Sequence, residues 1–200
     1  MRKIAHWLAA FLLLPSLALA QGYEVLDKPA VRDNNPETVL VHEFFSYACP
    51  HCYTFRPRLE AWAEKTEAPV EIVRVPVVFQ PSWEPLAKAY YVAEVLGALD
   101  KIHVPLFEAI HAENRRILSE KQLVDFFVEQ GLAREQVEQT FKSFPVDMKL
   151  RQAKQLADAY RIMSTPTLGV EGRYLLNPRA SGGQEGMLAE LEKLVRKEAE

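Results

Sequence analysis

The segment EFFSYACPHCYTF, residues 43–55, contains both cysteines of this 200-residue chain, Cys49 and Cys52. Only Pro50 and His51 separate them, so a disulfide between them encloses almost no chain. A disulfide stabilises a protein mainly by constraining its unfolded chain, and this effect grows with the length of the closed loop. We therefore expect this bond to act by being made and broken rather than as a structural cross-link.

The residues around the pair predict a strand, a helix and a second strand. The run TVLVHEFFSY, residues 38–47, is rich in β-branched and aromatic residues, which is typical of a strand buried on both faces. Proline is favourable at the first helical position, so a helix should begin near Cys49, with a kink at Pro57. Residues 70–79, VEIVRVPVVF, predict the second strand. This order indicates a parallel βαβ unit.

Residues 82–161 have a helical pattern instead. Ser119 and Gln122 form a capping-box pattern at the start of one predicted helix. The apolar residues at helical spacing should form the core of this region, and they include Leu86, Tyr90, Leu123, Phe126, Phe127, Val137, Phe141 and Phe144. The pattern predicts an inserted all-helical subdomain within an α/β protein.

The last part of the chain returns to strands. Residues 165–176 predict a hairpin that turns at Glu171 and Gly172. A final helix then presents Met187, Leu191 and Leu194 on one side. Together with the first βαβ unit, this predicts a four-stranded sheet with flanking helices.

The first twenty residues differ from the rest of the chain. Arg2 and Lys3 precede an apolar run over residues 4–14, and small residues lead up to Ala20. This is the plan of a secretory signal peptide, residues 1–20, cleaved after Ala20. The run is shorter than the roughly 20 residues that span a bilayer. The net charge of −3 does not favour nucleic acid as a partner.

Export and the predicted helix start together suggest what the two thiols do. At a helix N-terminus, unpaired backbone N–H groups and the helix dipole favour the thiolate of Cys49. His51 lies in the same turn and can add a donor or a positive charge. Such sites lower a cysteine pKa from about 8.5 to roughly 3.5–7.5. Cys52, one turn further in, should be more buried, with a normal or raised pKa. A stabilised thiolate makes the disulfide a stronger oxidant.

Other uses of a cysteine pair fit less well. A structural zinc site needs four ligands, commonly from two such pairs, and His42, His103 and His111 have no matching spacing. Covalent haem attachment needs a histidine directly after the second cysteine, where this chain has Tyr53. An inert local disulfide remains an alternative.

Glu43 is unusual because it lies inside an apolar strand, on the same face as Val41 and Phe45. An unpaired buried carboxylate is costly, and burial raises its pKa. Such a group can relay protons to and from Cys52 as the disulfide opens and closes. Alternatively, the carboxylate reaches solvent at the strand end or pairs with a nearby lysine.

With these residues identified, the chain resembles the thioredoxin superfamily and, within it, the exported thiol:disulfide oxidoreductases of the DsbA type. Four segments carry the resemblance, which runs over essentially the whole mature chain: EFFSYACPHCY (43–53), VPLFEAIH (104–111), STPT (164–167) and YLLNP (174–178). It implies a thioredoxin fold, βαβ followed by ββα around a mixed sheet, made by residues 21–81 and 162–200. Residues 82–161 would be the inserted helical subdomain.

The resemblance also implies roles at the cysteine pair. Cys49 would be the exposed, attacked cysteine and Cys52 its buried partner, within the Cys-Pro-His-Cys motif that includes Pro50. His51 would tune the thiolate, and Glu43 matches the strand glutamate of the family.

Further roles fall on the segment STPT. Pro166 would be the cis-proline beside the disulfide, and the Thr165 backbone would bind an extended substrate. No metal or organic cofactor is implied. The substrates would be reduced, unfolded exported proteins in the periplasm, and a quinone-linked membrane partner of the DsbB type would reoxidise the protein. Residues 21–37 are too short for the dimerisation domain of periplasmic isomerases, so a monomer is expected.

Two residues depart from the family pattern. Thr165 stands where the family often has valine, and threonine there also occurs in thiol isomerases. Pro57 is similar in position to the kink proline of thioredoxin. A reductase or isomerase on the same fold is therefore an alternative, which the reduction potential would distinguish. A peptide-binding chaperone is another, and it would keep its function after Cys49→Ser.

Overall fold

The computed structural model describes residues 22–30 and 37–199. The expected signal peptide, with its cleavage after Ala20, lies outside these residues. No helix within the described ranges is both long and apolar enough to cross a membrane.

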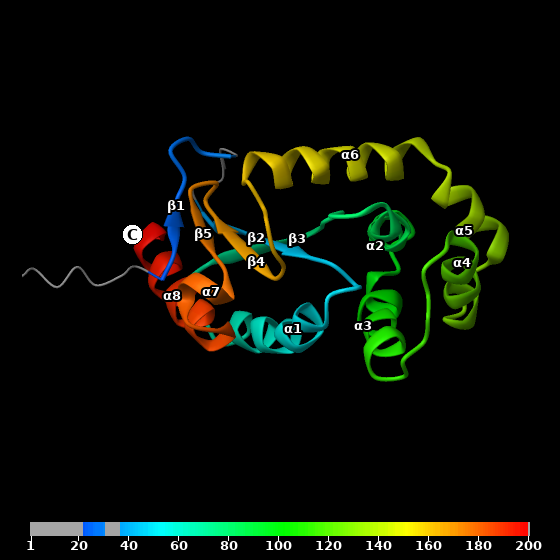
Figure 1. The fold of residues 1–200 in the computed structure, drawn as a ribbon, viewed down its shortest axis with the longest axis horizontal. Coiled ribbons are helices and arrows are strands. Elements are labelled where there is room, and N and C mark those ends of the chain that lie inside the picture. The colour runs from blue at the N-terminus through cyan, green and yellow to red at the C-terminus, as the bar shows by residue number, and fades with distance from the viewer. Residues whose placement is uncertain (1–21, 31–36, 200) are drawn as a thin grey trace, which may run out of the picture.

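The centre of the molecule is a mixed sheet (Figure 1). Its strands are β1 (Glu24–Val25), β2 (Val39–Phe45), β3 (Val70–Pro76), β4 (Thr167–Val170) and β5 (Tyr174–Leu176), in the spatial order β1-β5-β4-β2-β3. β2 and β3 are parallel, as the βαβ pattern predicted, and β4 runs antiparallel to β2. The expected four strands are joined by a fifth, because β1 pairs antiparallel with β5. β1 is only two residues long and has no strand pattern of its own, so tertiary pairing creates it.

Five helices lie between β3 and β4 in the chain, after a short 3-10 helix, Pro81–Trp83. They are α2 (Glu84–Val95), α3 (Leu99–His111), α4 (Glu120–Glu129), α5 (Arg134–Phe141) and α6 (Phe144–Ala159). In Figure 1, α2 to α5 lie beyond one end of the sheet, and α6 leads the chain back along one sheet face. This arrangement confirms the thioredoxin fold with inserted helices.

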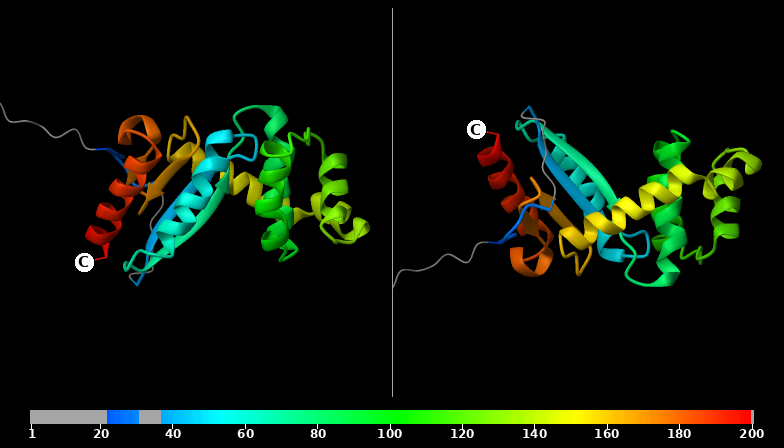
Figure 2. Two further views of the ribbon diagram at one scale, coloured as in Figure 1. Left: turned by 90° about the horizontal axis from the view of Figure 1, so that it is seen from below. Right: turned by 90° about the horizontal axis from the view of Figure 1, so that it is seen from above.

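The remaining helices cover the opposite face of the sheet. They are α1 (Pro50–Ala63), the short α7 (Pro178–Ser181) and α8 (Gln184–Glu198). The views of Figure 2 show α1 and α8 on one face and α6 on the other. Each face has its own apolar core because side chains alternate along β2: Val41 packs with α1 and α8, whereas Phe44 packs with the side that carries the inserted helices.

Local sequence signals are found at several element ends. Ser119 and Gln122 form both halves of the predicted capping box at the start of α4. Glu171 and Gly172 have φ of 52° and 66°, as the predicted acid-glycine turn requires. These signals depend only on neighbouring residues.

Phe144 is not part of the core, contrary to the prediction from helical spacing. It is 72% exposed, with the guanidinium of Arg151 5.9 Å from its ring centroid. The buried face of α6 is instead formed by Val146, Leu150 and Ala153. Two residues of helix correspond to about 200° of rotation, so Phe144 points away from the face of Val146.

Candidate active site

The two cysteines lie where β2 leads into α1. Cys49 is the N-cap residue of the helix and Pro50 is its first residue, as predicted. The Cys49 N–H donates to the Ser46 carbonyl over 3.0 Å, which closes a turn ahead of the helix. Both cysteines are free thiols in this structure.

Cys49 is the more accessible of the two. It retains 7% exposure and Cys52 retains none, so their order is as expected. Cys49 is nevertheless a buried residue with a small opening rather than an exposed one. Its sulfur is partly covered by the loop before β4.

The surroundings of the two thiols move their pKa values in opposite directions. A hydrogen bond from the Cys52 thiol lowers the pKa of Cys49 to about 5, against the effect of burial. Thr165 and the backbone N–H groups of Cys52 and His51 lower this pKa further. Burial, followed by the interaction with Cys49, raises the pKa of Cys52 well above its usual range. One sulfur is therefore a thiolate at neutral pH while its partner remains a thiol.

The loop before β4 approaches the pair from the far end of the chain. The peptide bond between Thr165 and Pro166 is cis, as the resemblance implied. The Cys49 sulfur lies 3.4 Å from the carbonyl oxygen of Thr165, to which it donates in its protonated form. The Thr167 hydroxyl donates to the Ser164 carbonyl over 2.9 Å and holds this loop closed. Segments far apart in the sequence thus meet at one sulfur.

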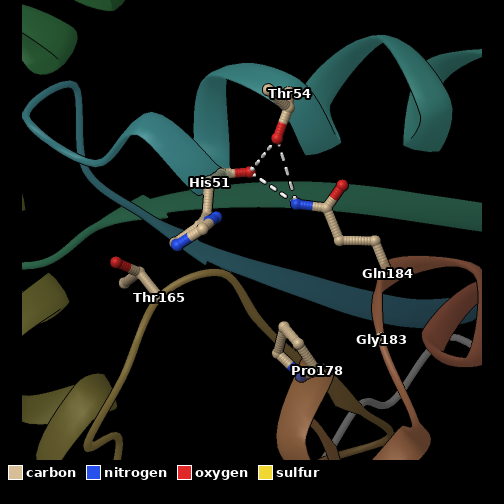
Figure 3. A pocket seen from close by; sticks show the side chains of 6 residues that line it. All are labelled: His51, Thr54, Thr165, Pro178, Gly183 and Gln184. Atoms are coloured by element: carbon tan, nitrogen blue, oxygen red, sulfur yellow. Dashed lines mark hydrogen bonds between the residues drawn. The ribbon is translucent and has the colours of Figure 1, made fainter.

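His51 is exposed at the edge of a cavity of about 290 Å³. The cavity is lined by His51, Thr54, Thr165, Pro178, Gly183 and Gln184, and Figure 3 shows these side chains around it. The Gln184 side-chain amide donates to the His51 carbonyl over 2.8 Å and to the Thr54 hydroxyl over 3.2 Å. His51 acts on the Cys49 pKa through its backbone N–H.

Sequence reasoning did not identify Gly183 and Gln184 as site residues. They lie at the start of α8, far in sequence from the cysteines, and no local motif marks them. Pro178 is the last residue of the segment YLLNP, which carries the family resemblance but predicts no role for it. The cavity is therefore a product of the tertiary structure.

Glu43 is buried within the strand β2, as predicted, and it has a partner. Its carboxylate accepts from Arg74 over 3.1 Å, and Arg74 also donates to Glu60 of α1 over 3.1 Å. Burial raises the pKa of Glu43 to about 7, although the positive charge of Arg74 opposes this. The hydrogen-bond partner of Glu43 is thus an arginine rather than a lysine or a cysteine.

The histidines considered as metal ligands have other partners. The ring of His103 is hydrogen-bonded to the Tyr47 hydroxyl, and His111 donates to the Tyr47 carbonyl. Within residues 22–30 and 37–199, no group of three or more His, Cys, Asp or Glu side chains could hold a metal ion.

A thioredoxin-type sheet that presents a dithiol at a helix N-terminus, next to a cis-proline, defines a thiol:disulfide oxidoreductase. The chain belongs to the DSBA-like thioredoxin domain family, whose model matches residues 40–187.

Individual relatives agree with this assignment. The thiol:disulfide interchange protein DsbA of Pseudomonas aeruginosa is 34% identical over 176 residues, which is 88% of this chain and 83% of that protein. The protein of the same name from Bordetella parapertussis is 34% identical over 191 residues, 94% of this chain and 91% of its own. The crystal structure of Pseudomonas aeruginosa DsbA superimposes with a TM-score of 0.81, covering 89% of this chain and 92% of that one. The chain is therefore a protein disulfide oxidoreductase of the DsbA type.

Proposed function

We propose that this protein is an exported oxidase that donates its Cys49–Cys52 disulfide to reduced proteins. The observation that carries this proposal is the contrast between the two thiols. The pKa of Cys49 is lowered to about 5, whereas that of Cys52 is raised. A pair of this kind favours the reduced form of the protein and so favours giving the disulfide away.

The exchange takes two steps. A substrate thiolate attacks the Cys49 sulfur, the Cys49–Cys52 bond breaks, and Cys52 leaves with the electron pair and takes up a proton. A second substrate thiolate then attacks the substrate sulfur of the mixed disulfide, and Cys49 leaves as a thiolate. The substrate loses two electrons and two protons and gains a disulfide. The protein gains the two electrons and holds one of the protons on Cys52, while Cys49 remains a thiolate at neutral pH and the second proton goes to solvent.

The size of the effect can be estimated from Cys49. With its pKa about 5, the thiolate is favoured at pH 7 by roughly 3 kcal/mol, since each pKa unit corresponds to about 1.36 kcal/mol. For a two-electron couple this makes the disulfide on the order of 60 mV more oxidising. The same low pKa makes Cys49 a good leaving group in the second step.

We assign Glu43 as the group that exchanges protons with Cys52. Its pKa of about 7 allows it to give or accept a proton near neutral pH. It lies on the strand beneath α1, on the same sheet face as Val41, which packs against Phe55 of that helix. Glu43→Gln is expected to slow exchange at Cys52 while leaving the fold intact. An exchange rate that stays unchanged from about pH 5 to 8 would refute this role.

Substrate binding is assigned to the other side of the pair. The backbone of Thr165 and the ring of Pro166 would hold an extended peptide in strand-like fashion, with the substrate cysteine at Cys49. His51 and Pro50 would complete the motif at the start of the helix. The cavity next to Thr165 would then receive a neighbouring substrate side chain.

The remaining proposals follow from the family. Residues 1–20 would be a signal peptide that sends the protein to the periplasm, where unfolded exported proteins are its substrates. A quinone-linked membrane oxidase of the DsbB type would reoxidise it. We further assign residues 21–81 and 162–200 to the thioredoxin-like domain and 82–161 to the inserted subdomain, in a monomeric protein.

The experiment that tests the function is the reduction potential of the Cys49–Cys52 pair, measured by equilibration with glutathione buffers. A value more oxidising than roughly −150 mV supports a disulfide donor, and a value near −270 mV, where thioredoxin lies, indicates a reductase. Cys49→Ser should abolish disulfide formation in a reduced model substrate. If the variant instead keeps the full function of the protein, the disulfide is not needed for that function, which would favour the chaperone alternative.

A further inference from the structure

Three aromatic side chains form a stripe on one face of α3. His103, Phe107 and His111 are spaced four residues apart, so they lie one above the other on the helix. The stripe faces the segment that carries the cysteine pair: the ring of Phe107 packs against Tyr47 with 4.8 Å between centroids. This face of α3 is therefore one contact between the inserted helices and the redox segment.

His111 contacts residues on both sides of the cysteines. Its Nε2 lies 2.8 Å from the Tyr47 carbonyl oxygen, two residues before Cys49. Because a carbonyl can only accept, Nε2 carries the proton. The same imidazole stacks on the ring of Tyr53, directly after Cys52, with 5.2 Å between centroids and 22° between planes.

Tyr47 is also held through its side chain. Its hydroxyl is 2.8 Å from Nδ1 of His103. Burial lowers the pKa of His103 to about 3, so this contact joins two neutral groups at neutral pH. The backbone and the hydroxyl of one residue are thus bound by two histidines of α3.

The position of Tyr47 determines how the next residues run. The turn that follows it is closed by the Cys49 N–H on the Ser46 carbonyl and by the Ala48 N–H on the Ser46 hydroxyl. This turn places Cys49 at the N-cap of α1, where the backbone N–H groups of Cys52 and His51 contribute to the lowered pKa of its thiol. A buried carbonyl without a partner is costly, so losing the His111 donor should shift this turn.

We propose that His111 is a positioning residue, through which the inserted helices hold the turn at residues 46–49 in the geometry that makes Cys49 the reactive sulfur. The proposal rests on the proposed function, in which Cys49 is the attacked cysteine. It gives the helical insert a role in the redox chemistry that does not require contact with the substrate.

Two substitutions separate the hydrogen bond from the stacked ring. His111→Phe keeps an aromatic ring against Tyr53 and removes the donor, whereas His111→Gln keeps an N–H donor and removes the ring. Glu108→Gln changes an exposed residue of the same helix and serves as the matched control. For each protein, the Cys49 pKa is followed by thiolate absorbance in the ultraviolet, and the equilibrium with glutathione is measured.

His111→Phe is expected to raise the Cys49 pKa and to shift the glutathione equilibrium toward the disulfide form by about fivefold, the typical effect of one hydrogen bond. His111→Gln and Glu108→Gln should stay within about twofold of the parent protein. The pKa and potential of the parent protein test the proposed function, and only the differences between variants test the role of His111.

Two results would overturn the role. His111→Phe could lower the free energy of unfolding of both redox forms equally and leave pKa and equilibrium unchanged, which would make His111 structural only. A shift in the Gln variant with none in the Phe variant would assign the effect to the ring instead of the donor. If His111→Phe does not fold, nitrogen NMR of the parent protein decides: His111 should carry its proton on Nε2, and the Nδ1-protonated tautomer contradicts the proposal.

Discussion

Glu43 and Arg74 lie directly opposite each other on the parallel strands β2 and β3 and form an ion pair of 3.1 Å. The pKa of Glu43 is nevertheless raised to about 7, because burial disfavours its charged form more than Arg74 favours it. Arg74 also binds Glu60, whose negative charge raises the Glu43 pKa further. The sheet thus holds a carboxyl group that titrates near neutral pH.

Because the pKa of Glu43 is raised, we expect the free energy of unfolding to fall as the pH rises. A raised folded-state pKa stabilises the protein fully below pH 4.5, and the effect is lost as the pH rises toward about 7. The loss is at most about 3 kcal/mol. Glu43→Gln should not show it. The free energy of unfolding of the parent protein and of Glu43→Gln is measured by urea unfolding across this pH range. Both proteins are studied in the disulfide form, in which the cysteines do not titrate. Parallel pH profiles for the two proteins would contradict the raised pKa.

In the reduced form, Cys49 should have the opposite effect and make the free energy of unfolding rise with pH. Its pKa is lowered from 9.0 to about 5, so its stabilising effect is complete above pH 9 and is lost as the pH falls to about 5. The full effect is at most about 5 kcal/mol. The disulfide form lacks this titration. The difference in free energy of unfolding between the two forms should therefore shrink toward low pH.

Urea unfolding of both redox forms over this pH range measures the difference. Reduced Cys49→Ser is the control, because a hydroxyl does not ionise in this range. Its pH profile should match that of the disulfide form up to about pH 8, below which the remaining Cys52 thiol stays protonated in both the folded and the unfolded chain. A difference between the two forms of the parent protein that is constant with pH would show that Cys49 is an ordinary thiol.

Thr165 is expected to adjust the reactivity of Cys49. A hydrogen bond from Thr165 is among the interactions that lower the Cys49 pKa. Thr165→Val removes the hydroxyl, so the Cys49 pKa should rise, by less than about one unit, and the disulfide should become less oxidising. Thiolate absorbance against pH measures the change. Thr140→Val, in which a hydroxyl that donates within α5 is lost, should leave the Cys49 pKa unchanged.

A side chain at position 169 is expected to destabilise the protein. A Cβ at this position would overlap the ring of Tyr160, whose hydroxyl is hydrogen-bonded to His42 over 3.0 Å and whose ring packs edge-on against Phe44. Gly169→Ala should therefore lower the free energy of unfolding by about 1–3 kcal/mol. In a Tyr160→Leu background the same change should cost less, and equal costs in the two backgrounds would show that the ring is not the obstacle.

Much of the fold was predictable because its signals are local. The apolar run before the cysteines, Pro50 at the helix start, and the turn at Glu171 and Gly172 each depend on a few neighbouring residues. The redox role of the cysteine pair could be predicted from the spacing of the two residues and from the predicted helix start alone. The cis peptide bond before Pro166 was predicted from the resemblance to a known family, because no physical pattern in the sequence indicates it.

Other features could not be predicted because they depend on which segments meet. β1 exists only because β5 offers it an edge, and Phe144 is exposed because the buried face of α6 lies elsewhere on the helix. The arginine opposite Glu43 follows from the register of two strands. Gln184 reaches the carbonyl of His51 across 133 residues of chain.

The sequence by itself determined the class of chemistry, because two thiols separated by two residues at a helix start carry their reactivity in covalent spacing and backbone direction. Only the tertiary structure decided how that reactivity is set. The charge on Cys49 depends on the hydrogen bond from the Cys52 thiol and, to a smaller extent, on Thr165. The Tyr47 carbonyl in the turn before Cys49 accepts a hydrogen bond from His111 of the inserted helices. Hydrogen bonds and burial act through distance in space, which the order of residues in the chain does not specify.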